Sequence, residues 1–333
     1  MIINFLIIIQ VKVMRRESKL KNGKRLLLRG IVLGAVICII FLLGSYYAFR
    51  KTCFRDDYSG IGISEDATWN EYQTLCDAYH LLHAQNETVR INVEDGTELV
   101  GHFYEVSDDA PVIIFFPGYR GNYAVCGVPF YRAAKMLNWN ILLVCNRASR
   151  ESAGKYSTLG AMEKGDCKEW VEWTTQRLGN DCSIYLGGLS MGASYILQAC
   201  DSLPTSNVRG IVSDCGFARP LDIIDGGTRE KLPKCIPIQV WDTFLECGTR
   251  LYGDFSVKNL NATNAIQKTS IPILFLHSDT DELAPISEIE SYCNSDIKKL
   301  VIIHGADHGE NYITDPELYM EALVDFLKEC QVR

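Results

Sequence analysis

The sequence predicts an α/β fold with a mostly parallel, eight-stranded sheet that carries helices on both faces. Eight short apolar or alternating runs recur between residues 88 and 304, and from the third run onward they are almost continuous in Val, Ile, Leu and Phe. Such runs are typical of parallel strands that are buried on both faces. Helix-like stretches separate the later runs, and this alternation of strand and helix favours a sheet between two helical layers.

The individual elements follow from the positions of these runs. We expect strands at 88–93, 99–106, 111–116, 140–145, 183–187, 208–214, 271–277 and 299–304. We expect helices at 65–83, 123–137, 159–178, 191–202, 287–294 and 315–329. The first two strands are separated by little more than Asp95-Gly96, which predicts a hairpin at one edge of the sheet. The stretch from about 217 to 269 is too long for an ordinary connection and predicts a small helical cap.

The N-terminal part differs in character from the rest of the chain. Residues 30–49 carry no charge, and a helix of that length rises about 30 Å, the thickness of the hydrocarbon layer of a membrane. Eight basic residues precede this segment, and only Arg50, Lys51 and Arg55 follow it closely. This excess of basic residues before the apolar segment predicts that the chain has four successive parts. These are a basic cytoplasmic segment over 1–29, a single transmembrane helix over 30–49, a stalk over 50–63 and an extracytoplasmic domain over 64–333.

A cleaved signal peptide is the alternative for this segment. Its apolar stretch would be unusually long, and no convincing small-x-small cleavage site lies near residues 45–48. We therefore favour a retained anchor in the cell membrane. A separate apolar run over 1–14 is too short to span a bilayer, and Met14 is an alternative start of translation.

Charge and cysteine content exclude several classes of function. Residues 1–51 carry ten basic residues and one acidic residue, whereas the remainder carries 23 basic and 40 acidic residues. A domain this acidic repels phosphate backbones, which argues against binding to nucleic acid. The chain has 13 cysteines but no CxxC pair, so the sequence predicts neither a zinc site nor a redox motif. Cysteines within apolar runs, such as Cys145, are expected in the core.

The strongest chemical signal is the segment Gly188-Leu189-Ser190-Met191-Gly192. It follows directly on an expected strand and precedes an expected helix. A serine on so sharp a turn has a strained backbone, and the two glycines remove Cβ atoms that would collide there. Its hydroxyl then stands at the carboxyl edge of the sheet, above the N-terminus of the next helix. The bare pattern is weak, but in this position it predicts a nucleophile at Ser190.

A nucleophilic serine requires a general base. His308 is the preferred candidate, because its loop, 305–309, follows the last expected strand and so lies at the same edge of the sheet as Ser190. His304, at the end of that strand, is the fallback.

The base in turn requires an acid that orients it. The expected strand 271–277 runs into a loop that contains Asp279 and Asp281. We prefer Asp281, because it lies further into the loop and can reach the loop of the histidine. Asp279 and Asp214, which ends the preceding strand, are its rivals.

Two backbone N–H groups are the expected donors to the oxyanion that forms during acyl transfer. Met191 follows the nucleophile and supplies one of them. Tyr119, in the glycine-containing loop 117–122 after the third strand, is expected to supply the other. Arg120 in the same loop is a candidate for substrate recognition.

From about residue 88 to 330 the chain resembles the α/β-hydrolase fold family. Within that family it is similar to bacterial hydrolases of the serine aminopeptidase-like and lysophospholipase-like kinds, which have membrane-anchored relatives. The matching segments are Pro117-Gly118-Tyr119-Arg120-Gly121-Asn122, Asn146-Arg147-Ala148, Glu151-Ser152-Ala153-Gly154-Lys155-Tyr156, Gly188-Leu189-Ser190-Met191-Gly192-Ala193, Ser213-Asp214-Cys215-Gly216-Phe217, Leu276-His277-Ser278-Asp279-Thr280-Asp281 and Gly305-Ala306-Asp307-His308. The resemblance implies a catalytic triad of Ser190, Asp281 and His308, with Tyr119 and Met191 as oxyanion donors. The chain order Ser, Asp, His agrees with it.

The sequence departs from the family pattern in three places. Pro117-Gly118 stands where His-Gly is usual, and His277-Ser278 stands where another His-Gly is usual. The segment 145–150 lacks the aspartate and the glycine of the usual Asp-x-Arg-x-x-Gly. The departures at 117 and 145–150 affect loops that shape the substrate pocket.

These observations predict a membrane-anchored serine hydrolase that cleaves a carboxylic ester through an acyl-enzyme, without a metal or an organic cofactor. Its expected partner is a small-molecule ester or an acyl lipid, since a tethered enzyme works beside a bilayer. A serine peptidase of the aminopeptidase kind is the first alternative, and Asp242 and Glu246 in the cap are acidic residues of the type that would hold a substrate ammonium. A catalytically inactive binding module and an acyltransferase are further alternatives.

Overall fold

The computed structural model of the protein describes residues 22–54, 67–149, 151–229 and 237–332. Its eight strands form one sheet in the order β1-β2-β4-β3-β5-β6-β7-β8. The strands are β1 (Glu87–Asn92), β2 (Glu98–Tyr104), β3 (Val112–Phe116), β4 (Asn140–Cys145), β5 (Ile184–Leu189), β6 (Val208–Asp214), β7 (Ile273–Ser278) and β8 (Lys298–Ile303). All eight expected strands are therefore confirmed.

The pairing of the strands also agrees with the prediction. The strand β1 pairs antiparallel with β2 in an edge hairpin, and β2 pairs antiparallel with β4. The remaining neighbours are all parallel. Every residue of β3, β4, β5 and β7 is buried, which is why these strands are apolar without alternation.

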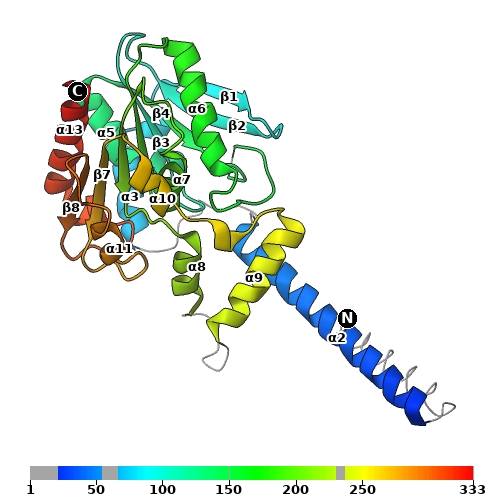
Figure 1. Ribbon diagram of the computed structural model, residues 1–333. Helices are drawn as coiled ribbons and strands as arrows, with labels where there is room; N and C mark the ends of the chain where they lie inside the picture. Colours follow the sequence, from blue (N-terminus) through cyan, green and yellow to red (C-terminus); the bar gives the residue numbers. More distant parts are fainter. Residues whose placement is uncertain (1–21, 55–66, 150, 230–236, 333) are drawn as a thin grey trace.

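Helices cover both faces of the sheet (Figure 1). One layer contains α6 (Glu163–Leu178), α7 (Met191–Ala199) and α10 (Thr263–Lys268), and the other contains α3 (Ala67–Ala78), α5 (Val128–Leu137) and α13 (Pro316–Val332). The short helices are α4 (Tyr123–Cys126), α11 (Ile286–Glu290), α12 (Asn311–Thr314) and the 3₁₀ turns η1 (Leu81–His83) and η2 (Val257–Asn259). Successive residues of β4 point into opposite layers: Leu142 packs into the first and Leu143 into the second.

Two expected helices are interrupted. The helix expected at 65–83 ends at Ala78, because His80 adopts a left-handed conformation with φ 48°, and a separate 3₁₀ turn follows. The helix expected at 123–137 divides at Gly127 into α4 and α5. Both breaks depend on local backbone conformations that an apolar pattern does not record.

The expected cap contains α8 (Pro220–Arg229) and α9 (Ile238–Tyr252). Figure 1 shows both helices below the carboxyl edge of the sheet, apart from the two covering layers. The helix α10 falls within the range expected for the cap but packs on α7.

One long apolar helix, α2 (Asn22–Cys53), projects from the domain (Figure 1). Its most apolar 18-residue window has a mean hydropathy of 2.8, and none of that window is buried. By length and composition this helix can cross a membrane. An apolar helix with this much exposed surface is not the core helix of a water-soluble protein, because a core helix is covered by its neighbours.

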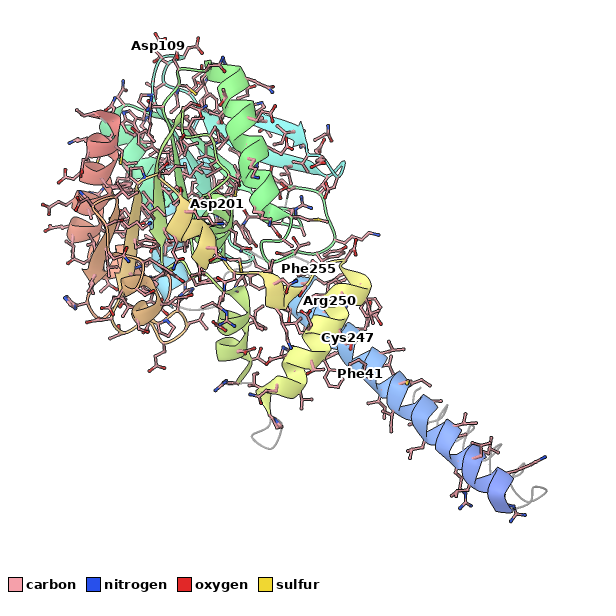
Figure 2. The ribbon with its side chains drawn as sticks, in the orientation of Figure 1. Phe41, Asp109, Asp201, Cys247, Arg250 and Phe255 are labelled. Atoms are coloured by element: carbon pink, nitrogen blue, oxygen red, sulfur yellow. The ribbon has the colours of Figure 1, made fainter. Side chains whose placement is uncertain are left out.

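The C-terminal part of α2 packs along α9. The ring centroids of Phe41 and Phe244 lie 5.3 Å apart, and those of Tyr46 and Tyr252 also lie 5.3 Å apart. Backbones meet closely here, because a Cβ on Gly248 would lie 2.3 Å from the carbonyl oxygen of Ser45. Phe41, Cys247 and Arg250 are among the residues that line a groove along this contact (Figure 2).

The helix also extends further than the expected transmembrane segment. Residues 50–53, which we expected at the start of a stalk, form its last turn, and residues 55–63 of that stalk lie outside the described residues. Ala48, Phe49 and Cys53 are buried in the core of the domain. The end of the helix is thus a packed part of the fold rather than a free linker.

Candidate active site

Ser190 occupies a strained turn between β5 and α7. Its φ of 52° and ψ of −115° place it in a conformation that non-glycine residues rarely adopt. The flanking glycines make this turn possible, because a Cβ on Gly188 would lie 2.5 Å from the amide nitrogen of Ala193, and one on Gly192 would lie 2.1 Å from the carbonyl oxygen of Phe116. The amide of Ser190 donates to the carbonyl oxygen of Asp214 at 2.8 Å, which holds the turn on β6.

The structure brings together the three residues that the sequence singles out. Ser190 Oγ lies 2.7 Å from His308 Nε2, and His308 Nδ1 lies 2.8 Å from Asp281 Oδ2. His308 is in the loop after β8 and Asp281 is in the loop after β7, so all three side chains stand at the carboxyl edge of the sheet. The second oxygen of Asp281 accepts from the amides of Leu283 and Ala284 at 3.0 and 2.8 Å. This leaves Oδ2 directed at the imidazole.

Burial and hydrogen bonding oppose each other at Asp281. Burial alone would raise the pKa of the Asp281 carboxyl, because it disfavours the charged form. The hydrogen bond and charge of His308, together with the hydrogen bond from the Ala284 amide, outweigh burial. The pKa of Asp281 is therefore lowered. A carboxylate in this position holds the proton of the imidazole on Nδ1 and leaves Nε2 free to accept one from a hydroxyl.

The rival residues have other partners. His304 Nδ1 lies 2.6 Å from Asp279 Oδ2 in an exposed pair beside the buried one. Asp214 lies deeper, where it accepts from Asn311 Nδ2 at 2.7 Å and from Tyr319 Oη at 2.8 Å. Burial raises the pKa of Asp214 to about 6 despite these two hydrogen bonds. The geometry therefore favours His308 over His304, and Asp281 over both of its rivals.

Cys215 is a residue of this site that the sequence argument missed. It follows Asp214 at the end of β6 with a φ of 42°, and its Sγ lies 4.0 Å from His308 Nε2. Burial raises the pKa of the Cys215 thiol, and the charge of Asp214 adds to this effect, so the thiol stays protonated at neutral pH. It does not compete with Ser190 as a nucleophile. Its position follows a strand end, which is the only signal in the sequence that it lies near the site.

The expected oxyanion loop lies beside Ser190. A Cβ on Gly118 would be 3.7 Å from the Cβ of Ser190. The next two side chains turn toward the end of α2: Tyr119 Oη donates to the carbonyl oxygen of Thr52 at 2.5 Å, and Arg120 Nη2 donates to that of Phe54 at 3.0 Å. The guanidinium of Arg120 also lies over the ring of Tyr119, 4.9 Å from its centroid. Arg120 thus binds carbonyls at the C-terminus of α2, which is where a helix dipole favours a cation.

The segment that departs from the family pattern supports this loop from the other side. Asn146 Nδ2 donates to the carbonyl oxygen of Pro117 at 2.8 Å. The buried Arg147 binds both carboxylate oxygens of Asp166, at 2.6 and 2.7 Å, and one of Asp95 at 2.8 Å. The loop after β4 is therefore held by the ion pairs of the buried Arg147 even without the usual aspartate and glycine.

Similar proteins of known structure share this architecture. An esterase of Pyrococcus furiosus superposes with a TM-score of 0.58 at 22% identity, over 74% of this chain and 92% of that one. An α/β hydrolase from a Penicillium species superposes with a TM-score of 0.57 at 18% identity, over 75% and 100% of the two chains. The chain has the α/β-hydrolase fold.

Two further comparisons extend this result. The ferulic-acid-bound esterase Est1E of Butyrivibrio proteoclasticus superposes with a TM-score of 0.55 at 17% identity, over 74% of this chain and all of that one. In sequence, the chain is 25% identical over 236 residues to the Bacillus subtilis protein YqkD, over 70% of this chain and 76% of YqkD. No protein-family model matches the chain.

Proposed function

We propose that the protein is a serine hydrolase that cleaves carboxylic esters through an acyl-enzyme. The observation that carries the proposal is the chain of hydrogen bonds from Ser190 through His308 to Asp281, at 2.7 and 2.8 Å, on a strained turn at the edge of the sheet. This is the arrangement that activates a serine hydroxyl. The known esterases among the proteins of similar fold support an ester as the substrate.

The proposed reaction has two halves. Ser190 Oγ attacks the ester carbonyl carbon, and its proton passes to His308 Nε2. The C–O bond to the alcohol breaks, and the alcohol leaves with the proton from His308. Water then attacks the acyl-enzyme in the same way and releases the acid, while Asp281 stabilises the imidazolium in both halves.

The backbone N–H groups of Met191 and Tyr119 are the proposed oxyanion donors. Met191 is the first residue of α7, where an amide has no partner within the helix. The loop that contains Tyr119 lies against Ser190 through Gly118. Two donors at this point stabilise the negative charge of the tetrahedral intermediate.

We further propose that α2 is retained as a membrane anchor, with the catalytic domain outside the cytoplasm. Cleavage of a signal peptide near residues 45–48 would remove Ser45, which lies against Gly248, and would leave Ala48 and Phe49 at a new chain end although both are buried in the domain. The basic residues that precede the helix favour a cytoplasmic N-terminus. A bilayer beside the cap makes acyl lipids the favoured class of ester.

A serine aminopeptidase is the second candidate, and the acidic residues of the cap bear on it. Glu246 accepts from Arg250 Nε, Ser256 Oγ and the Lys258 amide, so it is committed to holding the cap together. Asp242, the other candidate, interacts with Asp225 of the cap. Burial raises the pKa of the Asp225 carboxyl to about 7, and the hydrogen bond and charge of Asp242 add to this effect. This pair would hold a substrate ammonium if the protein were an aminopeptidase.

The test is hydrolysis of p-nitrophenyl esters from acetate to palmitate by the purified full-length protein in detergent, beside aminoacyl p-nitroanilides. We expect ester hydrolysis that falls at least about 10⁴-fold in Ser190→Ala and is unchanged in Ser202→Ala, a serine in the turn after α7. Cleavage of the anilides alone, with loss in Asp242→Asn, would support the peptidase instead. Equal rates in wild type and Ser190→Ala, or no turnover of any substrate, would overturn both.

A further inference from the structure

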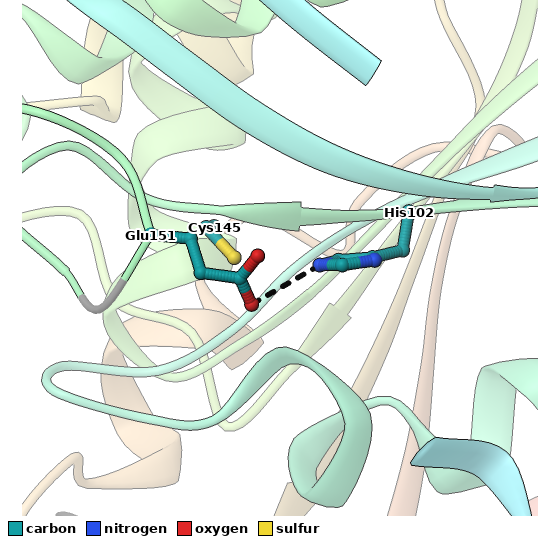
Figure 3. Close-up of side chains that lie close together, drawn as sticks. All are labelled: His102, Cys145 and Glu151. Atoms are coloured by element: carbon teal, nitrogen blue, oxygen red, sulfur yellow. Dashed lines mark hydrogen bonds and ion pairs between the residues drawn. The ribbon is translucent and has the colours of Figure 1, made fainter. Parts of the chain in front are cut away.

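His102, Cys145 and Glu151 form a cluster of metal-ligating side chains at the hairpin side of the sheet (Figure 3). His102 lies in β2, Cys145 ends the neighbouring β4, and Glu151 lies in the loop that follows β4. One nitrogen of His102, the Sγ of Cys145 and one carboxylate oxygen of Glu151 lie within 4.8 Å of one another. The cluster is separate from the hydrogen-bonded group of Ser190, His308 and Asp281.

The hydrogen bonds of His102 fix which ring nitrogen carries its proton. His102 Nδ1 lies 3.1 Å from Asn86 Oδ1. The Asn86 amide nitrogen donates to the carbonyl oxygen of Ala84 at 2.9 Å, so the oxygen is the atom that Asn86 turns toward the ring. Nδ1 therefore donates its proton to Asn86, and Nε2 of the neutral ring is an acceptor.

Nε2 faces a second acceptor. It lies 3.2 Å from Glu151 Oε1. A nitrogen lone pair and a carboxylate oxygen repel each other at this distance unless a positive charge lies between them. That charge is either a second proton on the ring or a metal ion bound to both atoms.

Cys145 distinguishes the two possibilities. A proton shared by His102 and Glu151 needs no third group, whereas a thiolate completes the nitrogen, oxygen and sulfur donor set that suits Zn²⁺. The separation of 3.2 Å between Nε2 and Oε1 is close to the edge of a tetrahedron of zinc ligands, about 3.3 Å for bonds of about 2.0 Å. The side chain of Cys145 is buried, and that of Glu151 is 39% exposed, so an ion can enter from the side of Glu151.

Neighbouring groups hold the ligands in place. The ring of Tyr123 stacks on the imidazole of His102, with centroids 4.1 Å apart and planes within 13°. Ser152 Oγ donates to the Cys145 carbonyl oxygen at 2.7 Å and accepts from the Val100 amide at 2.9 Å, so the residue after Glu151 is tied to both strands. Such outer contacts orient metal ligands, and their loss weakens metal binding.

We propose that His102, Cys145 and Glu151 bind a Zn²⁺ ion, with water in the fourth position. Cys145 binds as the thiolate and so gives up its proton on binding, and Asn86 orients His102 through Nδ1. The ion joins the edge hairpin to the loop after β4. This assignment goes beyond the proposed esterase chemistry, which requires no metal.

The test is titration of the purified full-length protein with Co²⁺, followed by competition for Zn²⁺ against a chromophoric chelator. We expect one equivalent of Co²⁺ with a sulfur-to-cobalt charge-transfer band, and loss of this band in Cys145→Ser. His102→Gln and Glu151→Gln should weaken Zn²⁺ binding at least tenfold, and Asn86→Ala about 10- to 100-fold. His83→Gln and Cys293→Ser, which change the same residue types elsewhere, should leave it unchanged.

The experiment can contradict the zinc site without contradicting the proposed esterase function. Ser190→Ala should bind Zn²⁺ as the wild type does. No binding above that of the folded Cys145→Ser variant, or binding that is equal in wild type, His102→Gln and Asn86→Ala, would overturn the zinc site and leave only the direct contact between His102 and Glu151. Melting curves with and without Zn²⁺ show which variants fold. The wild type, Ser190→Ala and the two control variants should gain more thermal stability from the ion than the variants of the proposed ligands.

Discussion

At the scale of single residues, the backbone conformation of Ser190 limits which residue types fit at the neighbouring positions 188 and 192. The turn that gives Ser190 its strained φ of 52° leaves no room for a Cβ at Gly188 or Gly192, because backbone atoms lie too close. A strained backbone of this kind persists where many surrounding contacts hold it in place. The two glycines of the turn are therefore expected to be structural requirements of the site, and not merely positions where a small residue fits.

Gly192→Ala should disrupt this turn. The new Cβ would lie 2.1 Å from the carbonyl oxygen of Phe116, so β3 or α7 must shift, and we expect a loss of about 2 kcal/mol or more in the free energy of unfolding. Gly165→Ala is the matched control, since nothing lies within 4 Å of its Cβ position in α6. There alanine should stabilise the helix by up to about 1 kcal/mol. Chemical denaturation of both variants measures the difference, and equal effects would contradict the crowding.

Asp281→Asn and Asp279→Asn separate the two His–Asp pairs. An asparagine at 281 favours the wrong tautomer of His308, so kcat for an ester should fall by about 10⁴-fold. The same change at 279 affects the exposed pair with His304 and leaves Oδ1 able to accept from the Gly305 amide, so it should alter kcat less than about twofold. A large fall in kcat for Asp279→Asn with little fall for Asp281→Asn would show that the His304–Asp279 pair, and not the His308–Asp281 pair, supports catalysis.

Asp214 makes stability depend on pH. Its pKa is raised to about 6, so the folded state prefers the neutral acid, and the stabilisation present below about pH 4 is lost as the pH rises through about 6. Asp214→Asn removes the titrating group. The variant should lose this decline between pH 4 and 6, even if it is less stable overall because the amide accepts one hydrogen bond fewer. Urea unfolding across that interval measures the slope, and an unchanged slope would contradict the assignment.

The sequence predicts that Ser190, His308 and Asp281 lie at one edge of the sheet, and the structure places each within hydrogen-bonding distance of the next there. The expected strand ends and the turn at Ser190 place the three side chains at one edge of the sheet. The choice between Asp279 and Asp281 depends on which carboxylate receives the Leu283 and Ala284 amides, and a sequence does not record this. Cys215 was missed for the same reason, because its approach to His308 depends on a left-handed residue after β6.

At the scale of elements, the end of α2 and the proposed oxyanion loop form one unit. Arg120 and Tyr119 bind the last carbonyls of the helix, and Asn146 holds Pro117 from the opposite side. We therefore expect the helix to contribute to the position of the loop. Arg120, which the sequence suggested for substrate recognition, instead has the contacts of a positioning residue.

Arg120→Ala tests this coupling. Loss of the contacts with α2 should let the loop shift, and kcat should fall by about tenfold with little change in KM, which corresponds to about 1.4 kcal/mol in the barrier. Arg219→Ala, which removes an exposed arginine of the cap paired with Asp222, is the control and should have no effect. A rise in KM alone would favour the role in substrate recognition. Unchanged values of both kcat and KM would contradict the coupling between α2 and the loop.

The contact between α2 and α9 was beyond the reach of the sequence. The absence of charges predicts an apolar helix over 30–49, but not its extension to Asn22 and Cys53. Its packing against the cap depends on the fit of Gly248 against Ser45 and of aromatic rings across the two helices. Surface complementarity of this kind arises only when both elements are in place.

At the scale of the whole molecule, the domain is attached to its proposed membrane anchor by a packed joint. Phe49 is 1% exposed and contacts Phe54, Tyr156 and Tyr252. If α2 spans a membrane as proposed, this contact would hold the cap beside the bilayer, which would suit an enzyme whose substrate arrives from the membrane.

Two truncations test this view. A chain of residues 41–333 keeps the buried end of α2, whereas a chain of 54–333 loses Ala48, Phe49 and Cys53 from the core. Removal of a buried Phe alone costs about 3–5 kcal/mol, so the shorter chain should melt well below the longer one and aggregate more readily. Equal melting temperatures would show that α2 is dispensable for the fold.

Covalent labelling of the full-length protein with a fluorophosphonate probe tests the central proposal most directly. The probe reacts with an activated serine hydroxyl, so mass spectrometry of the digested protein should find the adduct on the peptide that contains Ser190. Labelling should be lost in Ser190→Ala and fall strongly in His308→Gln, because the base is then absent. An adduct on another serine, or equal labelling of Ser190 with and without His308, would contradict the proposed nucleophile and base.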